Sequence, residues 1–181
     1  MRPSAVKFTY RDYVQFPEDN NRHEIIDGDH FMTPSPSTRH QRISQRLYDH
    51  LKPHVTTHRL GELFYAPTDV VLSDTDVLVP DLLFIRQERG SVITEKNIQG
   101  APDLVVEILS PSTAERDRGL KRTTYARFGV EEYWLVSPDT NTIEVWRLQE
   151  GIPSRTFTRS ERLTSKLLPG FELPLTDVFR P

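Results

Sequence analysis

The segment Val79-Pro80-Asp81-Leu82-Leu83-Phe84-Ile85 carries one carboxylate inside a run that is otherwise apolar. A second run, Leu104-Val105-Val106-Glu107-Ile108-Leu109, has the same character, because Glu107 is its one charged residue. Continuous apolar runs are typical of strands covered on both faces, and a buried carboxylate needs a cation or hydrogen-bond donors. The two runs therefore predict neighbouring strands of one sheet, whose carboxylates lie close enough to seat a hard divalent cation.

The flanking sequence alternates between the patterns of strands and helices. The predicted elements are a hairpin over 23–32, a helix from Ser37 or Thr38 that Pro53 closes or kinks, strands at 63–65, 69–72, 77–85 and 104–109, a helix over 113–128, a hairpin of 133–136 with 142–148, and an extended stretch at 167–173. Because Pro80 lacks an N–H group, its strand is expected to contain a bulge or to lie at an edge. The order predicts an α/β (α+β) fold with a mixed sheet flanked by helices.

Length and composition limit the class of protein. The chain has 181 residues and a net charge of −3, from 23 Lys and Arg against 26 Asp and Glu, which suits one domain over residues 1–181. No cysteine is present, so disulfides, thiolate zinc and a thiol nucleophile are excluded and a cytoplasmic location is expected. No signal peptide or membrane span is predicted. The net charge argues against bulk electrostatic coating of nucleic acid, so positive charge that binds DNA must be local or carried by a metal.

The predicted helix over 113–128 concentrates positive charge. Ser112 and Glu115 have the spacing of a capping box, and Gly129 stands where a left-handed C-terminal residue belongs. The predicted packing stripe is narrow and consists of Leu120, Thr124 and Phe128. The basic residues of the helix, opposed by Glu115 and Asp117 alone, are Arg116, Arg118, Lys121, Arg122 and Arg127.

Lys121 in this helix has two interpretations. If the helix packs on the sheet, it can aim the Lys121 ammonium at the carboxylates of the two apolar runs. Alternatively, Asp117 and Lys121 form an i, i+4 ion pair on the surface, worth about 0.2–0.5 kcal/mol. Their positions in the sequence alone do not separate the two.

Two other sets of polar residues compete as site candidates. Asp103 also follows a proline, but it lies about 13 Å from Glu107 along a strand, so the two cannot share one ion. Asp103 is interpreted instead as a turn residue at the entry to the strand. His50, His54 and His58 recur every four residues, as metal ligands on one helix face would, but Pro53 makes that helix doubtful and solvated polar residues at a helix end are the favoured interpretation.

Longer stretches join these features into one pattern. They are residues 79–85, 100–113 and 129–136, the side chains of Asp117, Lys121 and Tyr125, and the sequences His-Glu-Ile-Ile-Asp-Gly at 23–28, Ser-Pro-Ser-Thr-Arg-His at 35–40 and Leu-Pro-Gly-Phe-Glu-Leu at 168–173. The combination resembles the Uma-two family, a large bacterial group of restriction-endonuclease-like proteins, over nearly the whole chain. The resemblance implies the PD-(D/E)XK nuclease fold, with an αβββαβ core, to which this sequence adds an N-terminal hairpin and C-terminal strands.

The resemblance also implies roles for individual residues. Asp81 matches the first acidic position of the motif and Glu107 the second, which together hold Mg²⁺ or Mn²⁺, with the backbone carbonyl of Ile108 as a further ligand. Leu109 stands where the motif has its lysine. The family resembles nucleases in which that lysine has moved into the following helix, which points to Lys121 as the catalytic lysine. Secondary candidates are Glu24, His40, Asp103, Asp117 and Tyr125.

Three functions agree with these residues. The first is a Mg²⁺-dependent endonuclease acting on DNA, in which flanking phosphates contact Arg116, Arg118 and Arg122 unless these form only a solvated helix face. The second is a catalytically inactive nuclease-fold module that binds nucleic acid or protein, which Leu109 favours. The third is a metal-dependent hydrolase of another phosphate substrate. DNA is the expected partner, no membrane partner is expected, and a homodimer is expected if both strands of a duplex are cut.

Overall fold

The computed structural model describes residues 6–150 and 152–180, without the side chains of 152–154. Its elements in chain order are α1 (Tyr10–Tyr13), β1 (Arg22–Ile26), β2 (Asp29–Thr33), α2 (Thr38–Thr57), β3 (Gly61–Tyr65), β4 (Val70–Ser73), β5 (Asp76–Leu78), β6 (Leu82–Arg86), the 3₁₀ helix η1 (Gln87–Val92), β7 (Ile98–Gln99), β8 (Leu104–Ile108), α3 (Ala114–Arg116), the π-helical turn η2 (Asp117–Lys121), α4 (Arg122–Arg127), β9 (Glu132–Ser137), β10 (Thr142–Arg147), β11 (Ile152–Thr158), β12 (Arg162–Thr164), β13 (Glu172–Pro174) and α5 (Leu175–Val178).

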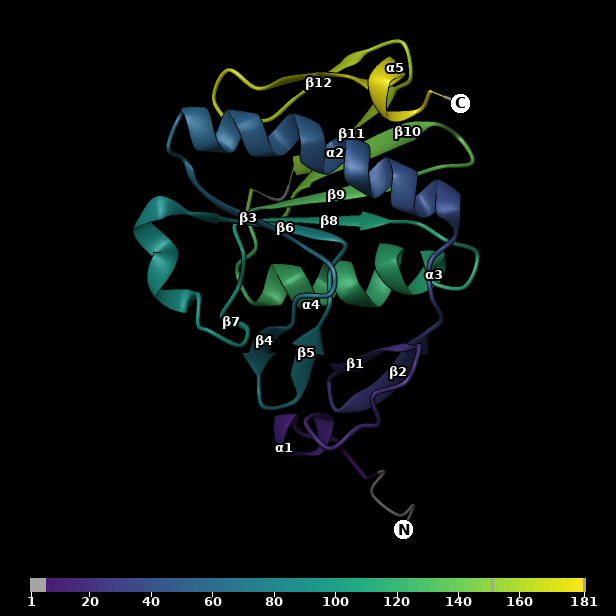
Figure 1. Cartoon of the computed structure of the whole chain (residues 1–181), viewed down its shortest axis with the longest axis vertical. Helices are drawn as coiled ribbons and strands as arrows, with labels where there is room; N and C mark the ends of the chain where they lie inside the picture. Colours follow the sequence, from purple (N-terminus) through teal and green to yellow (C-terminus); the bar gives the residue numbers. More distant parts are fainter. Residues whose placement is uncertain (1–5, 151, 181) are drawn as a thin grey trace.

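A six-stranded mixed sheet forms the centre of the molecule, in the order β11-β10-β9-β8-β6-β3. Strands β8 and β9 run parallel, whereas the other neighbours are antiparallel. Helix α2 covers one face and the continuous helix α3–η2–α4 covers the other (Figure 1). The succession α2, β3, β6, β8, α3–α4, β9 is the αβββαβ order, so the predicted fold class is confirmed.

Alternation along β8 decides which side chains face which helix. Leu104 and Val106 belong to the core beneath α2, whereas Val105 packs with Tyr125 on the opposite face. Because successive side chains of a strand point to opposite faces, Glu107 shares the face of Val105. The carboxylate therefore points toward the helix α3–η2–α4.

Helix α2 begins as predicted and continues further than predicted. Ser37 is its N-cap and accepts a hydrogen bond from the backbone N–H of His40, and Ile43, Leu47 and Leu51 form its buried stripe. Of the two expectations for Pro53, closure of the helix is wrong, because α2 runs to Thr57. Pro53 is exposed, on the side of the helix where water can satisfy the carbonyl group that it leaves without a partner.

A second sheet, in the order β2-β1-β5-β4-β7, lies beyond α4 (Figure 1). The predicted N-terminal hairpin is confirmed, since Asp27 and Gly28 turn with positive φ values of 50° and 75° between the paired β1 and β2. The single strand predicted over 77–85 is wrong. Residues up to Leu78 belong to this sheet and residues from Leu82 to the central sheet, so the chain crosses between the sheets at Pro80, where no ladder donor is needed.

The helix over 114–127 departs from two predictions. The capping box is absent, because the N-cap residue is Thr113 and no side chain caps the helix, while the Ser112 hydroxyl lies 3.1 Å from that of Ser110. The predicted packing stripe is wrong at one of its three positions: Leu120 is 39% exposed, whereas Thr124 is buried and Phe128 packs against the core. The helix also buries Asp117 and Lys121, which are each 2% exposed. This helix buries a charged face, because the opposing strands carry complementary charges.

The end of the chain follows the prediction more closely. Strands β9 and β10 form the predicted hairpin, and Gly129 has a φ of 92° at the end of α4, as predicted. The expected C-terminal strands are present as β12 and β13, which pair with each other. With α5 they lie on the outer side of α2 (Figure 1).

Candidate active site

Asp81 and Glu107 lie side by side at one end of two paired strands. Leu82 is opposite Val106 in the antiparallel ladder of β6 and β8, so Asp81 comes one position before β6, level with Glu107. The backbone N–H of Ile108 donates to Oδ2 of Asp81 at 2.8 Å. Both carboxylates are 2% exposed, in agreement with the expectation of neighbouring strands.

Asp81 is held by two side chains from outside the central sheet. Nη2 of Arg22, on β1, lies 2.9 Å from its Oδ1, and Nε2 of His40, on α2, lies 3.1 Å from its Oδ2. Burial acts to raise the pKa of Asp81, but the hydrogen bond with His40 and the charge of Arg22 outweigh it and lower the pKa to about 2. Asp81 is therefore a carboxylate at neutral pH.

Lys121 joins three acidic side chains. Its Nζ lies 2.7 Å from Oε1 of Glu24, 2.9 Å from Oε1 of Glu107 and 3.6 Å from Oδ1 of Asp117. Burial acts to lower the pKa of Lys121, but the three carboxylates outweigh it and hold that pKa above its usual value. Of the two interpretations of Lys121, the structure shows the ammonium aimed at the sheet, and the pair with Asp117 is not a surface pair, because both side chains are 2% exposed.

Glu107 lies at the centre of this cluster. It also accepts a hydrogen bond from the Tyr125 hydroxyl at 3.2 Å. Burial raises the pKa of Glu107 to about 8, since the carboxylates of Asp117, Asp81 and Glu24 add to the effect and Lys121 only partly opposes it. The positive charge of Lys121 is therefore too small to keep all the acidic side chains around it ionised at neutral pH.

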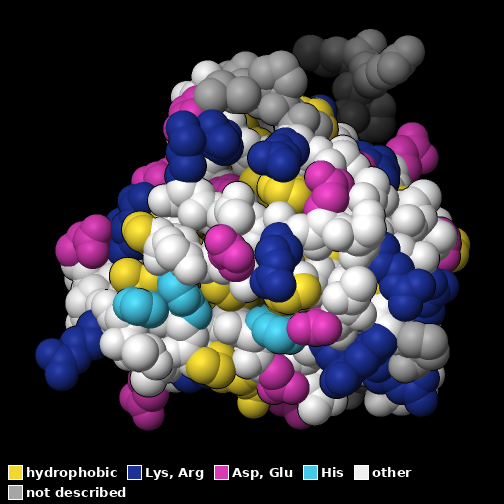
Figure 2. Space-filling model, turned by 90° about the horizontal axis from the view of Figure 1, so that it is seen from above, with side chains coloured by type: hydrophobic (Ala, Val, Ile, Leu, Met, Phe, Trp, Pro, Cys, Tyr) yellow, Lys and Arg dark blue, Asp and Glu magenta, His cyan; other side chains and the backbone are white. Residues whose placement is uncertain are grey.

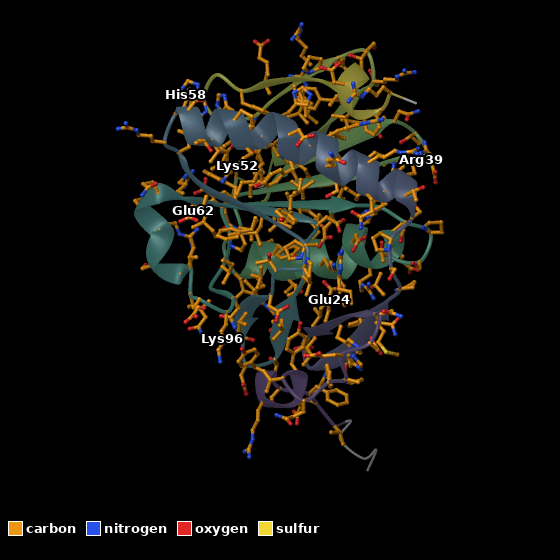
Figure 3. All side chains as sticks on the ribbon, in the orientation of Figure 1. Glu24, Arg39, Lys52, His58, Glu62 and Lys96 are labelled. Atoms are coloured by element: carbon orange, nitrogen blue, oxygen red, sulfur yellow. The ribbon has the colours of Figure 1, made fainter. Side chains whose placement is uncertain are left out.

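Glu24 connects the N-terminal hairpin to the cluster. Its Oε1 accepts from the backbone N–H of Val79 at 3.0 Å, next to the crossover between the sheets. Figure 3 shows Glu24 between the hairpin and the helix α3–η2–α4. The hairpin therefore supplies one acidic side chain to a site that otherwise belongs to the central sheet.

The donor chemistry of the cluster fits a divalent cation of the Mg²⁺ type. Mg²⁺ is usually held by one or two carboxylates together with waters and substrate phosphates. Within the described residues, Oε2 of Glu24 and Oδ1 of Asp117 are buried without a hydrogen-bond partner, and each lies 3.6 Å from a cationic nitrogen. No group of three His, Asp or Glu side chains in the same residues is spaced to hold a metal by itself, so the fit rests on Asp81 and Glu107 with ligands from solvent.

A pocket of about 240 Å³ opens over these side chains. Among the three arginines predicted to bind phosphate, Arg116 alone lines it, and its Nη2 donates to Oγ1 of Thr33 at 2.6 Å. Arg118 forms an ion pair with Glu144, and the guanidinium of Arg122 lies 4.1 Å from the centre of the Trp146 ring. Two of the three are therefore engaged outside the pocket.

The remaining secondary candidates separate into two groups. Glu24, His40, Asp117 and Tyr125 all contact Asp81, Glu107 or Lys121, as given above. Asp103 lies before the opposite end of β8, where Arg89 pairs with it at 2.9 Å and the backbone N–H of Arg86 donates to it at 2.8 Å. This placement agrees with its interpretation as a structural residue.

The histidines of α2 are not grouped as metal ligands in the described chain. Nε2 of His54 lies 3.1 Å from the carbonyl oxygen of Pro169, and His50 lies 3.7 Å from Asp177.

Figure 2 looks onto the face formed by α2 and the C-terminal segment, where basic and acidic side chains are interspersed. This face shows no broad surface of one charge.

Arg22 and Arg39 were not predicted from the sequence, although both line the pocket. Arg39 lies near the start of α2 (Figure 3) and donates to the carbonyl oxygen of Pro138. Arg22 had a usable signal. It precedes Glu24 by two residues, one position before the predicted hairpin over 23–32, and alternation places the two side chains on one face if the strand extends by that one residue.

The fold and this acidic, lysine-containing pocket define the class of restriction-endonuclease-like proteins. The chain belongs to the Uma2 family, whose description reads "Putative restriction endonuclease" and whose match spans residues 10–176.

Two similar proteins extend this comparison. An uncharacterized protein of Synechocystis sp., slr1290, is 30% identical over 151 residues, which cover 80% of this chain and 77% of that protein. A crystal structure of a "putative nuclease belonging to DUF820" from Anabaena variabilis matches with a TM-score of 0.81 and 22% identity, over 95% of this chain and 97% of that one. The structural match supports the fold. Separately, none of the helices in residues 6–150 and 152–180 has the length and apolar character of a membrane span.

Proposed function

We propose that this protein is a metal-dependent endonuclease that hydrolyses phosphodiester bonds of DNA. The observation that carries the proposal is the buried convergence of Asp81, just before β6, with Glu107 of β8 and Lys121 of η2 in the lining of one pocket. Family membership supports the reaction class. The fold alone does not, because one fold serves many functions.

The metal seat consists of the carboxylates of Asp81 and Glu107 with the backbone carbonyl of Ile108. A bound Mg²⁺ or Mn²⁺ lowers the pKa of a water molecule and stabilises negative charge on the attacked phosphate. The low pKa of Asp81 keeps one ligand ionised at all working pH values. Glu107 needs a second positive charge to stay ionised near neutral pH, since its pKa in the cluster is about 8.

Lys121 positions the nucleophile or the scissile phosphate as a compact point charge. Glu24, Asp117 and Glu107 hold its ammonium from three sides, which fixes its position before the substrate binds. The hydroxyl of Tyr125 orients Glu107 from the helix side. Arg116 and Arg39, which line the pocket, contact the flanking phosphates, which positions the strand without reading its sequence.

The catalytically inactive module is the second candidate, and one observation favours it. Arg22 and Lys121 already pair with the two carboxylates of the seat, an arrangement that satisfies Asp81 and Glu107 without a metal. In that case the chain would bind DNA equally well with and without divalent ions.

The experiment uses supercoiled plasmid with Mg²⁺ or Mn²⁺ and the variants Asp81→Asn and Glu107→Gln. We expect both to lower the cleavage rate by at least about a hundredfold, as loss of a major electrostatic contribution does. Glu62→Gln on β3 is the matched control, because Glu62 is exposed. Cleavage that survives in both site variants would exclude this site, and metal-independent binding without cleavage would establish the inactive module.

A further inference from the structure

A second hollow continues from the active-site pocket. It has a volume of about 610 Å³ and lies between the segment 13–23, the segment 34–36 and residues 66–69. The two hollows share four lining residues, namely Arg22, Pro34, Ser35 and Pro36. We call this second hollow the side groove. A polymer held over Asp81 and Glu107 would reach it directly past Arg22.

The side groove is unsuited to phosphate. Among its described lining residues, Arg22 is the one Lys or Arg, while Glu18, Asp19 and Asp69 are acidic. Burial raises the pKa of Asp69 from its ordinary value. The active-site pocket, by contrast, is lined by Arg22, Arg39, Arg116 and Lys121. Charge therefore places the backbone of a nucleic acid over the first hollow and not in the second.

The lining of the side groove suits a flat, hydrogen-bonding group. It combines the rings of Tyr13 and Phe16 with the amides of Asn20, Asn21 and Gln41. Val14, also in the lining, is 53% exposed. A nucleobase makes both kinds of contact, since its faces stack on aromatic and apolar side chains and its edges form hydrogen bonds with polar groups.

The aromatic rings are held in place before any ligand binds. The Tyr13 hydroxyl donates to Asp69 at 2.9 Å, and the Phe16 ring centre lies 4.3 Å from that of His30 and 5.4 Å from that of His23. Side chains that are already ordered lose little conformational entropy when a ligand binds.

We infer that the side groove receives an unpaired nucleobase of the strand whose phosphate occupies the active-site pocket. The inference rests on the proposed function, and it adds that the substrate is single-stranded or has a base turned out of the stack beside the scissile bond. Unpaired bases are available for such contacts, whereas those within a duplex are not.

Binding of two labelled oligomers tests the inference with the full chain in EDTA, which prevents metal-dependent cleavage. One oligomer is a twelve-nucleotide dT strand and the other a twelve-unit strand with every base removed, so both carry the same phosphates. We expect the dT strand to bind about tenfold more tightly, the scale of one or two stacked bases. In the triple variant Val14→Ala, Asn20→Ala, Gln41→Ala this preference should fall to below about threefold.

The matched control is Val6→Ala with Gln45→Ala, since both residues are exposed and neither lines the groove; it should keep the full preference. A 5-iodouracil strand of the same length should photo-crosslink within residues 13–23. Equal binding of the two oligomers by the wild-type chain, or a preference unchanged in the triple variant, would overturn the inference while plasmid cleavage leaves the proposed function standing. Failure to bind either oligomer, together with absence of cleavage, would overturn both.

Discussion

Nζ of Lys121 lies 2.9 Å from Oε1 of Glu107, and both side chains are 2% exposed. The contact joins the helix α3–η2–α4 to β8 through charges rather than through an apolar stripe. Because Glu24 from the N-terminal hairpin shares the same ammonium at 2.7 Å, one lysine connects three parts of the chain. Under the proposed function, stability and activity therefore depend on the same side chain.

Replacement of Lys121 by Met should both inactivate and destabilise the protein. Loss of one partner of a buried ion pair costs about 3–5 kcal/mol, because the remaining charges are left unpaired. Urea unfolding measures this change. Lys52→Met, on α2 (Figure 3), should change the free energy of unfolding by less than about 0.5 kcal/mol, because this lysine is partly exposed. An equal loss in both variants would contradict the role of the buried lysine.

The pH dependence of stability should change in Glu107→Gln. In the folded chain the pKa of Glu107 is about 8, against an ordinary value of 4.5. Between these two pH values the folded state binds one more proton than the unfolded state, so this residue makes stability fall as pH rises. Without added metal, the Gln variant should be more stable than the wild type at pH 8.5 by about 1–4 kcal/mol, since one pKa unit corresponds to about 1.4 kcal/mol.

The difference in stability between Glu107→Gln and the wild type should vanish near pH 4.5, where Glu107 is protonated in the folded wild type. Urea unfolding between pH 4.5 and 9 in EDTA follows both limits. Glu62→Gln serves as the control and should follow the wild-type curve. A Gln variant that is less stable at pH 8.5 than the wild type would show that Glu107 is ionised and well paired in the folded chain.

Arg22→Met should have opposite effects on metal and on nucleic acid. Arg22 lies 2.9 Å from Asp81, so its positive charge competes with a cation at that carboxylate. We expect Mn²⁺ to bind about tenfold more tightly to the variant, as judged by titration calorimetry without DNA, which corresponds to about 1.4 kcal/mol of charge interaction. DNA binding should weaken, and Arg118→Met, which removes a distant arginine, should leave Mn²⁺ affinity unchanged.

Arg116→Ala should reduce the salt dependence of DNA binding. One lost phosphate contact lowers the slope of log K against log salt by about one. Arg118→Ala and Arg122→Ala should leave the slope unchanged, because neither arginine lines the pocket, whereas Arg116 does. A similar decrease in all three variants would instead indicate that the whole helix faces the nucleic acid.

The central part of the site could be predicted because its carboxylates break the rule that buried strands are apolar. A single carboxylate in an apolar strand is conspicuous, and Asp81 and Glu107 were found in this way, as was the sheet that holds them. Position in the sequence leaves two interpretations of Lys121, and the family resemblance is what points to it as the catalytic lysine. Periodicity identifies buried faces by their apolar residues, and the helix α3–η2–α4 buries charges instead, so Leu120 was assigned to the core and is 39% exposed.

Other features depend on contacts that no local pattern contains. Arg22 reaches Asp81 across 59 positions of sequence, from a second sheet whose separate existence the sequence did not reveal. No characteristic residue pattern marks the π-helical turn at Asp117–Lys121 either. Such turns are frequent at functional sites. The strand predicted through Pro80 failed for the same reason, since only tertiary structure decides which sheet each half joins.

The wide separation of the site residues along the sequence has a consequence for the synthesis of the protein. Arg22 and Glu24 come from the early part of the chain, Asp81 from the middle and Lys121 from the later part, and only long-range pairing brings them together. A nascent chain cannot assemble the pocket until residue 121 has left the ribosome and the helix around it has docked. The acidic cluster is therefore complete only after most of the chain has folded.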